Sequence, residues 1–199
     1  SIAEELNKLF LEVIIANSFD ADALKILKMK KNLRLIDASK YIFKENLKFI
    51  SNNEEIMIQS EDIKKFNIKD FKVVSKMKPS AKQMKNLLFA FNVCRYVKSN
   101  AIVLVADETT AGIGSGQPSR LDSCQIAINK MNKFIDYKDE IVAASDAFFP
   151  FKDGIEKLIQ SGVSAVIQPS GSIRDKEIIK FANETDTILV FSKTRHFRH

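Results

Sequence analysis

The spacing of hydrophobic residues over residues 1–80 predicts short helices and strands in a polar background. Helical spacing covers residues 4–11 and 20–31, and short apolar runs predict strands at residues 13–15, 33–36, 56–58 and 73–74. The second helix starts with acidic residues and ends with lysines, and charges in this order stabilise a helix through its dipole. Residues 40–78 are otherwise rich in Asn and Lys, and we interpret them as connecting structure.

From residue 79 onward the predicted elements are longer and alternate regularly. A helix is predicted over residues 79–97, and its apolar face holds Met84, Leu87, Leu88, Phe91 and Val93. After it we expect strands at 101–106, 141–144, 165–168 and 188–191, and helices at 119–131, 154–160 and 172–183. This succession predicts an α/β fold in three layers, with a mostly parallel sheet flanked by helices.

Four segments with binding chemistry follow predicted strands. They are the glycine-rich stretch 112–120, the stretch that begins at Asp146, residues 170–172, and Arg195. Ligands bind outside the carboxyl ends of the strands in sheets of this kind. We therefore expect a ligand site at one edge of the sheet, built from these four segments.

The glycine-rich stretch does not match a known nucleotide-binding fingerprint. Gly112, Gly114 and Gly116 give GxGxG rather than GxGxxG, and no Gly-Lys-Ser/Thr follows. We interpret the stretch as a flexible turn that enters a helix, with Pro118 in the first turn. Arg120 then lies near the helix N-terminus, where an anion is stabilised. The alternative is a tight turn with an exposed arginine.

An aromatic and proline corner, Phe-Phe-Pro-Phe at residues 148–151, precedes a predicted helix. Its rings cannot all face inward from a short loop, so at least one is expected to line a surface slot for a flat ring. Asp153 follows at the helix start, where it either caps the helix and complements its dipole or accepts paired N–H bonds from an aminopteridine. Ser172 and Asp175 have the spacing of a capping-box variant, with N–H groups that could also hold a ligand carbonyl.

The stretch Arg195-His-Phe-Arg-His199 carries four basic side chains in five residues. Arg195 is a candidate bidentate ligand for a phosphate. The stretch is either a frayed basic tail or a segment that folds back into a site after a buried strand.

Charge and cysteine content exclude several classes of protein. The net charge is +6, but the lysines are scattered among Asp, Glu and Asn, which argues against a nucleic-acid-binding module. A purely structural oligomerisation unit leaves the ligand-like loops unexplained. No run is long and apolar enough to span a membrane. The two cysteines, Cys94 and Cys124, are expected in helix cores of a reduced, cytoplasmic protein without zinc or another metal ligated by His or Cys.

Five motifs occur in an order that resembles a known enzyme family. They lie at residues 98–103, 112–123, 144–154, 167–175 and 195–199. They resemble the bifunctional purine-synthesis enzymes that combine AICAR transformylase with IMP cyclohydrolase. The match is strong over residues 81–199 and weaker upstream.

The resemblance implies a fold, a reaction and partners. In this family a formyl group passes from 10-formyltetrahydrofolate to the amino group of AICAR in IMP synthesis. The transformylase is built of two cytidine-deaminase-like units without zinc, and the enzyme is a homodimer. Residues 81–199 would be the second unit, and residues 1–80 connecting structure of the same transformylase. No nucleic acid or membrane partner is implied.

The resemblance also assigns site residues. It implies that AICAR contacts Asn100, Arg120, Phe148 and Arg195, with Arg195 on the phosphate and Asn100 near the formyl transfer as a supporting catalytic residue. Asp153 would hold the pterin, beside Leu121, Pro150, Ser172 and Ile173. A monovalent cation near Asp146 is a further implication. Ser170 stands where the family more often has glycine.

The sequence departs from the family in one respect that concerns catalysis. The family's Lys-His pair, in a K-H-x-N-P motif, is absent from this sequence, whose only histidines are His196 and His199. Removal of a proton from the AICAR amine and stabilisation of the oxyanion need such groups. We expect a C-terminal fragment that binds ligands and is inactive alone.

Overall fold

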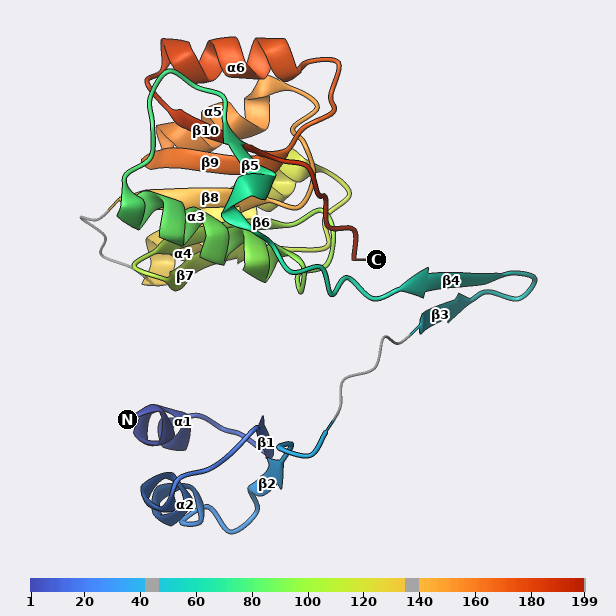
Figure 1. Ribbon diagram of the computed structural model, residues 1–199, viewed down its shortest axis with the longest axis vertical. Coiled ribbons are helices and arrows are strands. Elements are labelled where there is room, and N and C mark those ends of the chain that lie inside the picture. Colours follow the sequence, from blue (N-terminus) through green and yellow to red (C-terminus); the bar gives the residue numbers. More distant parts are fainter. Residues whose placement is uncertain (42–46, 135–139, 199) are drawn as a thin grey trace. The chain divides into compact units, whose positions relative to one another are not determined.

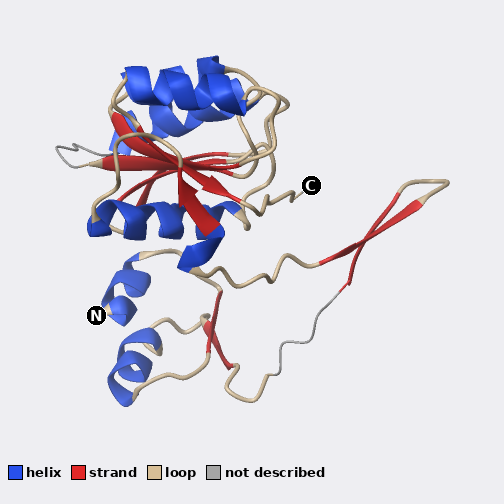
Figure 2. Cartoon of the chain, turned by 45° about the horizontal axis from the view of Figure 1, so that its top comes forward, coloured by secondary structure: helices blue, strands red, loops and turns tan. Residues whose placement is uncertain are grey.

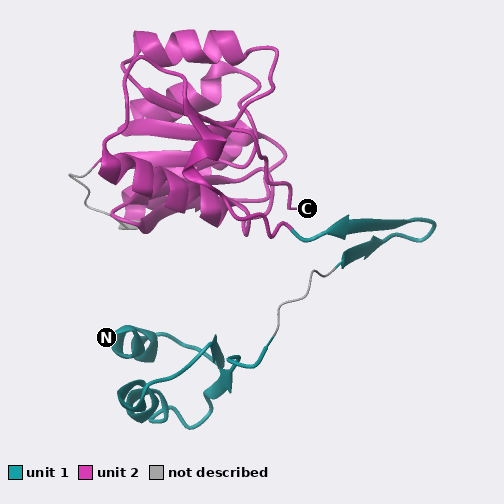
Figure 3. Cartoon of the chain, in the orientation of Figure 1, with its two compact units in different colours: residues 1–61 teal, residues 62–199 magenta. Residues whose placement is uncertain are grey.

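The computed structural model describes residues 1–41, 47–134 and 140–198 (Figure 1). Its contacts divide the chain into two compact units, Ser1–Glu61 and Asp62–His199 (Figure 3). The family resemblance implies another boundary, at residue 80, between connecting structure and the second unit of the transformylase. The compactness of the two units does not test that boundary, which stays a prediction. Part of the predicted connecting structure, residues 42–46, lies outside the described residues.

The first unit contains two helices and two small sheets. Its elements are α1 (Ile2–Lys8), β1 (Val13–Ala16), α2 (Ala21–Leu27), β2 (Arg34–Asp37), β3 (Leu47–Ser51) and β4 (Ile56–Ser60). Asp20 caps α2, since its carboxylate accepts a hydrogen bond of 2.6 Å from the Ala23 N–H. β1 and β2 are parallel, and β3 and β4 form an antiparallel hairpin. The predicted elements are confirmed, whereas β3 was not predicted.

The second unit is built on one six-stranded sheet. Its elements are η1 (Ile68–Asp70), β5 (Phe71–Val73), α3 (Ala81–Cys94), β6 (Ile102–Ala106), β7 (Thr109–Gly114), α4 (Arg120–Phe134), β8 (Ile141–Ser145), α5 (Lys152–Gln160), β9 (Val163–Pro169), α6 (Asp175–Glu184) and β10 (Ile188–Ser192). The strand order is β5-β10-β9-β8-β6-β7.

The sheet is mixed, so the prediction of a mostly parallel sheet is wrong. β8, β9 and β10 are parallel to one another, whereas β6 is antiparallel to both β7 and β8, and β5 is antiparallel to β10. The cause is a tight turn after β6. Asp107 and Glu108 both have positive φ, 46° and 54°, as the central residues of hairpin turns often do. The chain therefore reverses into β7 instead of crossing over to a parallel strand.

Helices cover both faces of this sheet, which confirms the three-layer arrangement (Figure 2). α3 covers one face, where Leu87 and Phe91 lie in the same cluster as Val103 and Val105 of β6. α4, α5 and α6 cover the other face, over Ile102 and Leu104 and their neighbours. Alternate residues of β6 thus enter different cores, as the pleat of a strand requires.

The buried face of α3 differs in part from its prediction. Leu87 and Phe91 are buried as expected, but Met84, Leu88 and Val93 are only half-buried. The remaining buried positions are Gln83, Asn86, Ala90 and Cys94. The buried face of α3 therefore combines two large apolar side chains with small and polar residues.

Two glycines of the predicted flexible turn lie instead in strand β7. A Cβ atom on Gly112 would lie 2.1 Å from the Ala127 carbonyl oxygen, and one on Gly114 would lie 1.9 Å from that of Ser123. These residues are glycines because α4 approaches the strand closely, and not because a ligand does. Only Gly116, with φ of +67°, lies in the turn itself. Pro118 precedes α4 and is not in its first turn.

The candidate segments nevertheless meet at one edge of the sheet. β8, β9 and β10 all end there. Ile102, at the start of β6, pairs with Ser145 at the end of β8, and also with Gly114 at the end of β7. The hairpin therefore brings the residues that follow β7 back to the edge at which the parallel strands end.

Candidate ligand pocket

A pocket of about 470 Å³ lies at this edge of the second unit. Four separate parts of the chain line it: Asn100, residues 118–121, residues 147–151 with 153–154, and Arg195 with Phe197. Asn100 lies just before β6, the second part includes the start of α4, the third leads from β8 into α5, and the last follows β10. A volume of this size is in the range of small-molecule sites.

The pocket contains most of the residues singled out from the sequence. Those that line it are Asn100, Arg120, Leu121, Phe148, Pro150, Asp153 and Arg195. Ser172 and Ile173 do not line it, and Ile173 is fully exposed. The structure thus brings together seven of these nine residues, from four segments.

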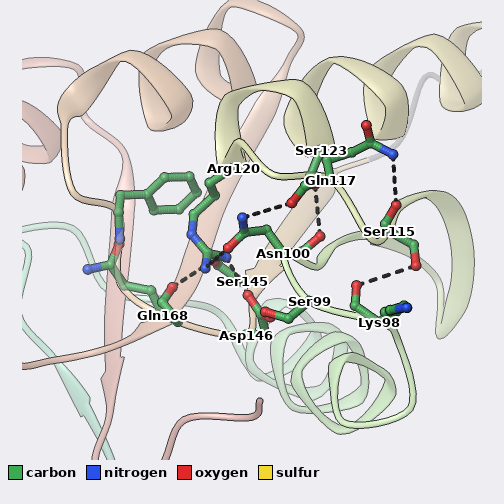
Figure 4. Close-up of polar contacts among 12 residues, drawn as sticks. Lys98, Ser99, Asn100, Ser115, Gln117, Arg120, Ser123, Ser145, Asp146 and Gln168 are labelled. Carbon is green, nitrogen blue, oxygen red and sulfur yellow. Dashed lines mark hydrogen bonds and ion pairs between the residues drawn. The ribbon is translucent and has the colours of Figure 1, made fainter. Parts of the chain in front are cut away.

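The carboxylate of Asp146 is buried and pairs with Arg120, which lines the pocket (Figure 4). Arg120 pairs with one oxygen of this carboxylate through Nη1, which also donates a bond of 2.8 Å to the Ser145 hydroxyl. The Ser99 hydroxyl donates a 2.5 Å bond to the other oxygen. A buried ion pair of this kind needs such additional bonds, because desolvation of both charges is costly.

Asn100 joins this ion pair to the turn before α4. Its side-chain oxygen accepts a bond of 2.8 Å from Arg120 Nη2. Its amide nitrogen donates to the carbonyl oxygens of Gln117 and Pro118, at 2.9 and 3.1 Å (Figure 4). Asn100 therefore fixes the position of the Arg120 guanidinium relative to the turn.

Arg120 is buried, with 9% of its surface exposed, so the alternative of an exposed arginine in a tight turn is wrong. Three of the five N–H donors of its guanidinium are used by Asp146, Ser145 and Asn100. Its charge is compensated by Asp146, and two donors remain for a ligand in the pocket that it lines.

The phenylalanines of the aromatic corner lie partly in the core and partly at the pocket. Phe149 is buried and packs against Gly154, where a Cβ atom would lie 2.8 Å from its ring. Phe148 is half-buried and Phe151 is 51% exposed, and both line the pocket. The prediction that at least one ring lines a surface slot is confirmed.

Asp153 is an exposed carboxylate at the second residue of α5. Phe151 occupies the N-cap position, and no side chain caps the helix, so Asp153 is not the cap that one sequence alternative proposed. Among the described residues its carboxylate accepts the N–H of Gly154 at 2.7 Å. The carboxylate complements the helix dipole and still has lone pairs that face the pocket.

Arg195 is exposed at the pocket, and the chain around it is tied down. Its guanidinium carbon lies 5.1 Å from the centre of the Phe197 ring. The Ser99 N–H donates a bond of 2.8 Å to the Arg198 carbonyl, and Arg198 Nη1 donates one of 3.0 Å to the Tyr96 carbonyl. The frayed-tail alternative is therefore wrong for residues 194–198, whereas His199 lies outside the described residues.

The loop before α6 differs from its prediction. α6 begins at Asp175, and Ser172 is not its N-cap; the Ser172 hydroxyl accepts the Arg174 N–H at 3.1 Å. The Asp175 carboxylate accepts the N–H groups of Gly171 and Ser172, at 2.8 and 3.2 Å, so these donors are already used. The Arg174 guanidinium lies 4.8 Å from the centre of the Phe151 ring, which places this loop beside the pocket.

Sequence reasoning missed several residues that build the pocket. The Ser99 hydroxyl donates to the Asp146 carboxylate, the Ser145 hydroxyl accepts a bond from Arg120, and Phe151 and Phe197 line the cavity. All four lie within the quoted motifs, but nothing in their spacing indicated their partners. Gln168 is also buried beneath the aromatic corner, where its Oε1 accepts the Phe149 N–H at 3.4 Å.

Other features predicted from the sequence concern the core. Cys94 and Cys124 are buried in α3 and α4 as expected. Burial raises the pKa of both thiols, that of Cys124 to about 12. Within residues 1–41, 47–134 and 140–198, no three His, Cys, Asp or Glu side chains cluster as a metal site would require. No helix in the same ranges is long and apolar enough to cross a membrane.

The second unit is a three-layer α/β domain with a pocket in which charged and aromatic residues meet at the end of the sheet. A sequence model described as "AICARFT/IMPCHase bienzyme" matches residues 1–130. The chain therefore belongs to this family, which confirms the resemblance read from its motifs.

Similar curated proteins carry one name, bifunctional purine biosynthesis protein PurH. The protein from Lactobacillus acidophilus is 44% identical over 199 residues, which cover 99% of this chain and 38% of that protein. The protein from Aquifex aeolicus is 44% identical over 198 residues, 99% of this chain and 38% of its own length. The protein from Brachyspira hyodysenteriae is 42% identical, with 99% and 37% covered. The chain thus spans less than two fifths of the length of these relatives.

Proposed function

We propose that this chain supplies the substrate-holding part of an AICAR transformylase, where AICAR and 10-formyltetrahydrofolate bind side by side. The observation that carries the proposal is the convergence of Asn100, Arg120, Phe148, Asp153 and Arg195 on one pocket from four segments. In the proposal the second unit is a cytidine-deaminase-like unit without zinc, in the cytoplasmic bifunctional enzyme whose other activity is IMP cyclohydrolase.

AICAR would occupy the part of the pocket between Arg195 and the Asp146 network. Arg195 is exposed and can bind a phosphate through two parallel N–H bonds. Phe148 offers a face for the imidazole ring, and the two remaining Arg120 donors can bind its carboxamide oxygen. Because Arg120 is held by three partners, it would not have to reorganise when AICAR enters.

The pterin would occupy the part of the pocket near α5. The exposed Asp153 carboxylate can accept two N–H bonds from an aminopteridine edge, and such charge-assisted pairs also fix orientation. Leu121 and Pro150 supply apolar contacts. Ser172 and Ile173 would be reached only by the part of folate that extends past Phe151, against which Arg174 stacks.

The pocket is suited to binding and orientation rather than to proton transfer. During transfer the AICAR amine attacks the formyl carbon and loses a proton to a base, and the formyl oxygen needs a donor while its charge develops. The bond from the formyl carbon to folate N10 then breaks, and N10 takes up a proton as tetrahydrofolate leaves. No lysine or histidine lines the described pocket. The Asn100 side chain is already bonded to Arg120, Gln117 and Pro118, so we assign it a positioning role. The base would come from elsewhere in the enzyme, as the Lys-His pair of the family does, or from the partner in a homodimer.

A monovalent cation beside Asp146 is not needed for this proposal. The Asp146 carboxylate is paired with Arg120 and accepts the Ser99 hydroxyl, so its charge is already compensated. These residues do not fit a further cation at that carboxylate, and we derive no step through one.

Calorimetry on this chain tests the proposal. Arg195→Ala should weaken AICAR binding at least about tenfold, since a charge-assisted bond to phosphate is lost, and should leave a folate analogue unaffected. Asp153→Asn should do the reverse. The matched controls are Lys193→Ala, an exposed neighbouring cation, and Glu156→Gln, a carboxylate later in α5; neither lines the pocket.

The outcomes separate the proposal from its alternatives. Equal effects of Arg195→Ala and Lys193→Ala would indicate a diffuse charge effect and contradict the assigned phosphate site. Affinity for nucleic acid that falls steeply with salt would favour the basic-module alternative. In a parallel formyl-transfer assay we expect binding without turnover, and turnover by this chain would show that the pocket contains its own base.

A further inference from the structure

His196 is a buried histidine that neither the family resemblance nor the proposed function uses. Its side chain is 1% exposed. The ring lies 4.6 Å from that of Phe91 and 5.3 Å from that of Phe66, between ring centres. Nδ1 is bonded to the Asp62 carboxylate, and the buried Nε2 has no hydrogen-bond partner among the described residues. The ring is therefore held by apolar packing and one carboxylate.

The backbone of His196 bonds the terminal segment to Asp146, the residue that pairs with Arg120. Its N–H donates a bond of 2.9 Å to the Asp146 carbonyl oxygen. The carboxylate of the same Asp146 is paired with Arg120. The residues on either side, Arg195 and Phe197, line the pocket. Arg195, the side chain that would bind a phosphate, and the neighbouring Phe197 ring are thus positioned by the buried residue between them.

We propose that His196 is a positioning residue: the neutral ring anchors the terminal segment and so fixes Arg195 at the pocket, and protonation of the ring releases it. The pocket would then lose affinity for a phosphate-bearing ligand in mild acid. This inference rests on the proposed function only in taking Arg195 as the phosphate ligand; the anchor itself is tested without any ligand.

The electrostatic surroundings set the direction of this switch. Burial lowers the pKa of His196 below its ordinary value of 6.5; the nearby Asp62 carboxylate opposes this, Arg95 adds to it, and Asp146 opposes it more weakly. A released, hydrated ring therefore takes up a proton before the anchored ring does. Anchoring is complete above about pH 6.5 and weakens as the pH falls below it. A protonated ring would also bury an Nε2–H without an acceptor.

Hydrogen exchange and NMR on this chain test the anchor directly. The sequence has two histidines, so a His199→Gln variant leaves the ring signals of His196 alone. The amide of Ser99, which donates to Arg198, and that of His196, which donates to Asp146, report whether the segment is in place. We expect their protection factors to fall as His196 becomes protonated. Protection that persists through that titration would overturn the proposal.

The pH dependence of AICAR binding tests the consequence for the pocket. The ligand's own phosphate titrates near pH 6, so the comparison is between the chain with its natural residue and His196→Leu, whose apolar side chain needs no partner. From pH 7.5 to 5.5 we expect affinity to fall at least about fivefold more with histidine than with leucine. Equal losses would overturn the proposal.

A third arm separates this inference from the proposed function. Asp62→Asn removes the carboxylate that stabilises the charged ring in its anchored position, so affinity should fall further between pH 6.5 and 5.5 than in the parent chain. An unchanged profile in a folded Asp62→Asn variant would also contradict the role given to this pair. If AICAR binds at no pH, the proposed function fails, and amide exchange alone decides whether His196 is an anchor.

Discussion

The two units use similar hydrophobic sequences with different results. Every residue of β6 and β8, in the second unit, is buried, whereas every residue of β3 and β4, in the first, is exposed. Both pairs of strands are rich in Ile, Val, Phe or Leu. The difference is what covers them: helices lie on both faces of the six-stranded sheet, and the β3–β4 hairpin pairs only with itself. Apolar strands become a core only when other layers pack on them.

The polar interactions differ in the same way. In the first unit the ion pairs are local and solvent-exposed, such as Lys25 with Asp22, and exposed pairs contribute little. In the second unit Arg120 and Asp146 lie 26 positions apart in the sequence and are both buried. We expect the second unit to depend on specific partners and the first to be tolerant of substitution.

The largest expected effect is that of Asp146→Ala. It would leave the buried Arg120 charge without its partner, which should lower the free energy of unfolding by about 3–5 kcal/mol. Urea denaturation followed by circular dichroism measures the change. Asp22→Ala, which removes the exposed partner of Lys25, is the control and should have no measurable effect. Similar losses of stability in both variants would show that the buried ion pair of the second unit matters no more than the exposed pair of the first.

A smaller loss is expected from Gly114→Ala. The new methyl group would overlap the Ser123 carbonyl, so α4 would have to move away from β7, at a cost of about 1–3 kcal/mol. Gly171→Ala is the useful comparison, because space is open there and only its φ of +116° opposes the change. If Gly114→Ala is as stable as the parent chain in thermal unfolding, the close approach of α4 is not what requires glycine.

A loss of about 1 kcal/mol is expected from Ser80→Ala. The Ser80 hydroxyl caps α3 by accepting the Gln83 N–H at 3.1 Å, and the Gln83 Oε1 accepts the Ser80 N–H at 2.8 Å. Ser80→Thr should retain most of the stability, because its hydroxyl can accept the same bond. Equal melting temperatures for alanine and the natural serine would show that packing alone holds the helix start.

The smallest effect is expected from Phe49→Ala, in β3. This ring is 64% exposed, so its removal should change stability by no more than about 0.5 kcal/mol. The matched substitution Phe91→Ala removes a fully buried ring and should cost about 3–5 kcal/mol. A large loss for Phe49→Ala in this chain would mean that the hairpin is covered in solution.

The sequence predicted the parallel part of the sheet better than the rest. β8, β9 and β10 are continuous apolar runs separated by amphipathic helices, and such patterns depend on neighbouring residues only. β7 was missed because Gly112 and Gly114 are typical of loops. Their real cause, the approach of α4, is a tertiary contact that no local pattern records. The hairpin depends on positive φ at both Asp107 and Glu108, and glutamate, unlike aspartate or glycine, is not a usual residue there.

The residues that line the pocket could be predicted from the sequence, but the hydrogen bonds and ion pairs among them could not. The motifs gathered the residues that line the pocket because they follow strands that end at one edge. The burial of Arg120 could not be predicted, because its partners Asn100 and Asp146 come from segments 20 and 26 positions away. The loop before α6 was misread for a related reason, since Asp175 uses the N–H groups that appeared available.

The turn at Asp107 and Glu108, where the chain reverses, and the pocket are two regions of the second unit that can change independently. This turn lies at the end of the sheet away from the pocket, because β6 starts at the pocket edge and runs away from it. A longer connection there would alter the ion pairs of the turn with Lys82 and Lys85 of α3 and the bond from the Glu108 N–H to the Asn86 side chain. The turn is thus the natural place to insert a fluorescent or affinity peptide, since the residues that face a ligand would keep their positions.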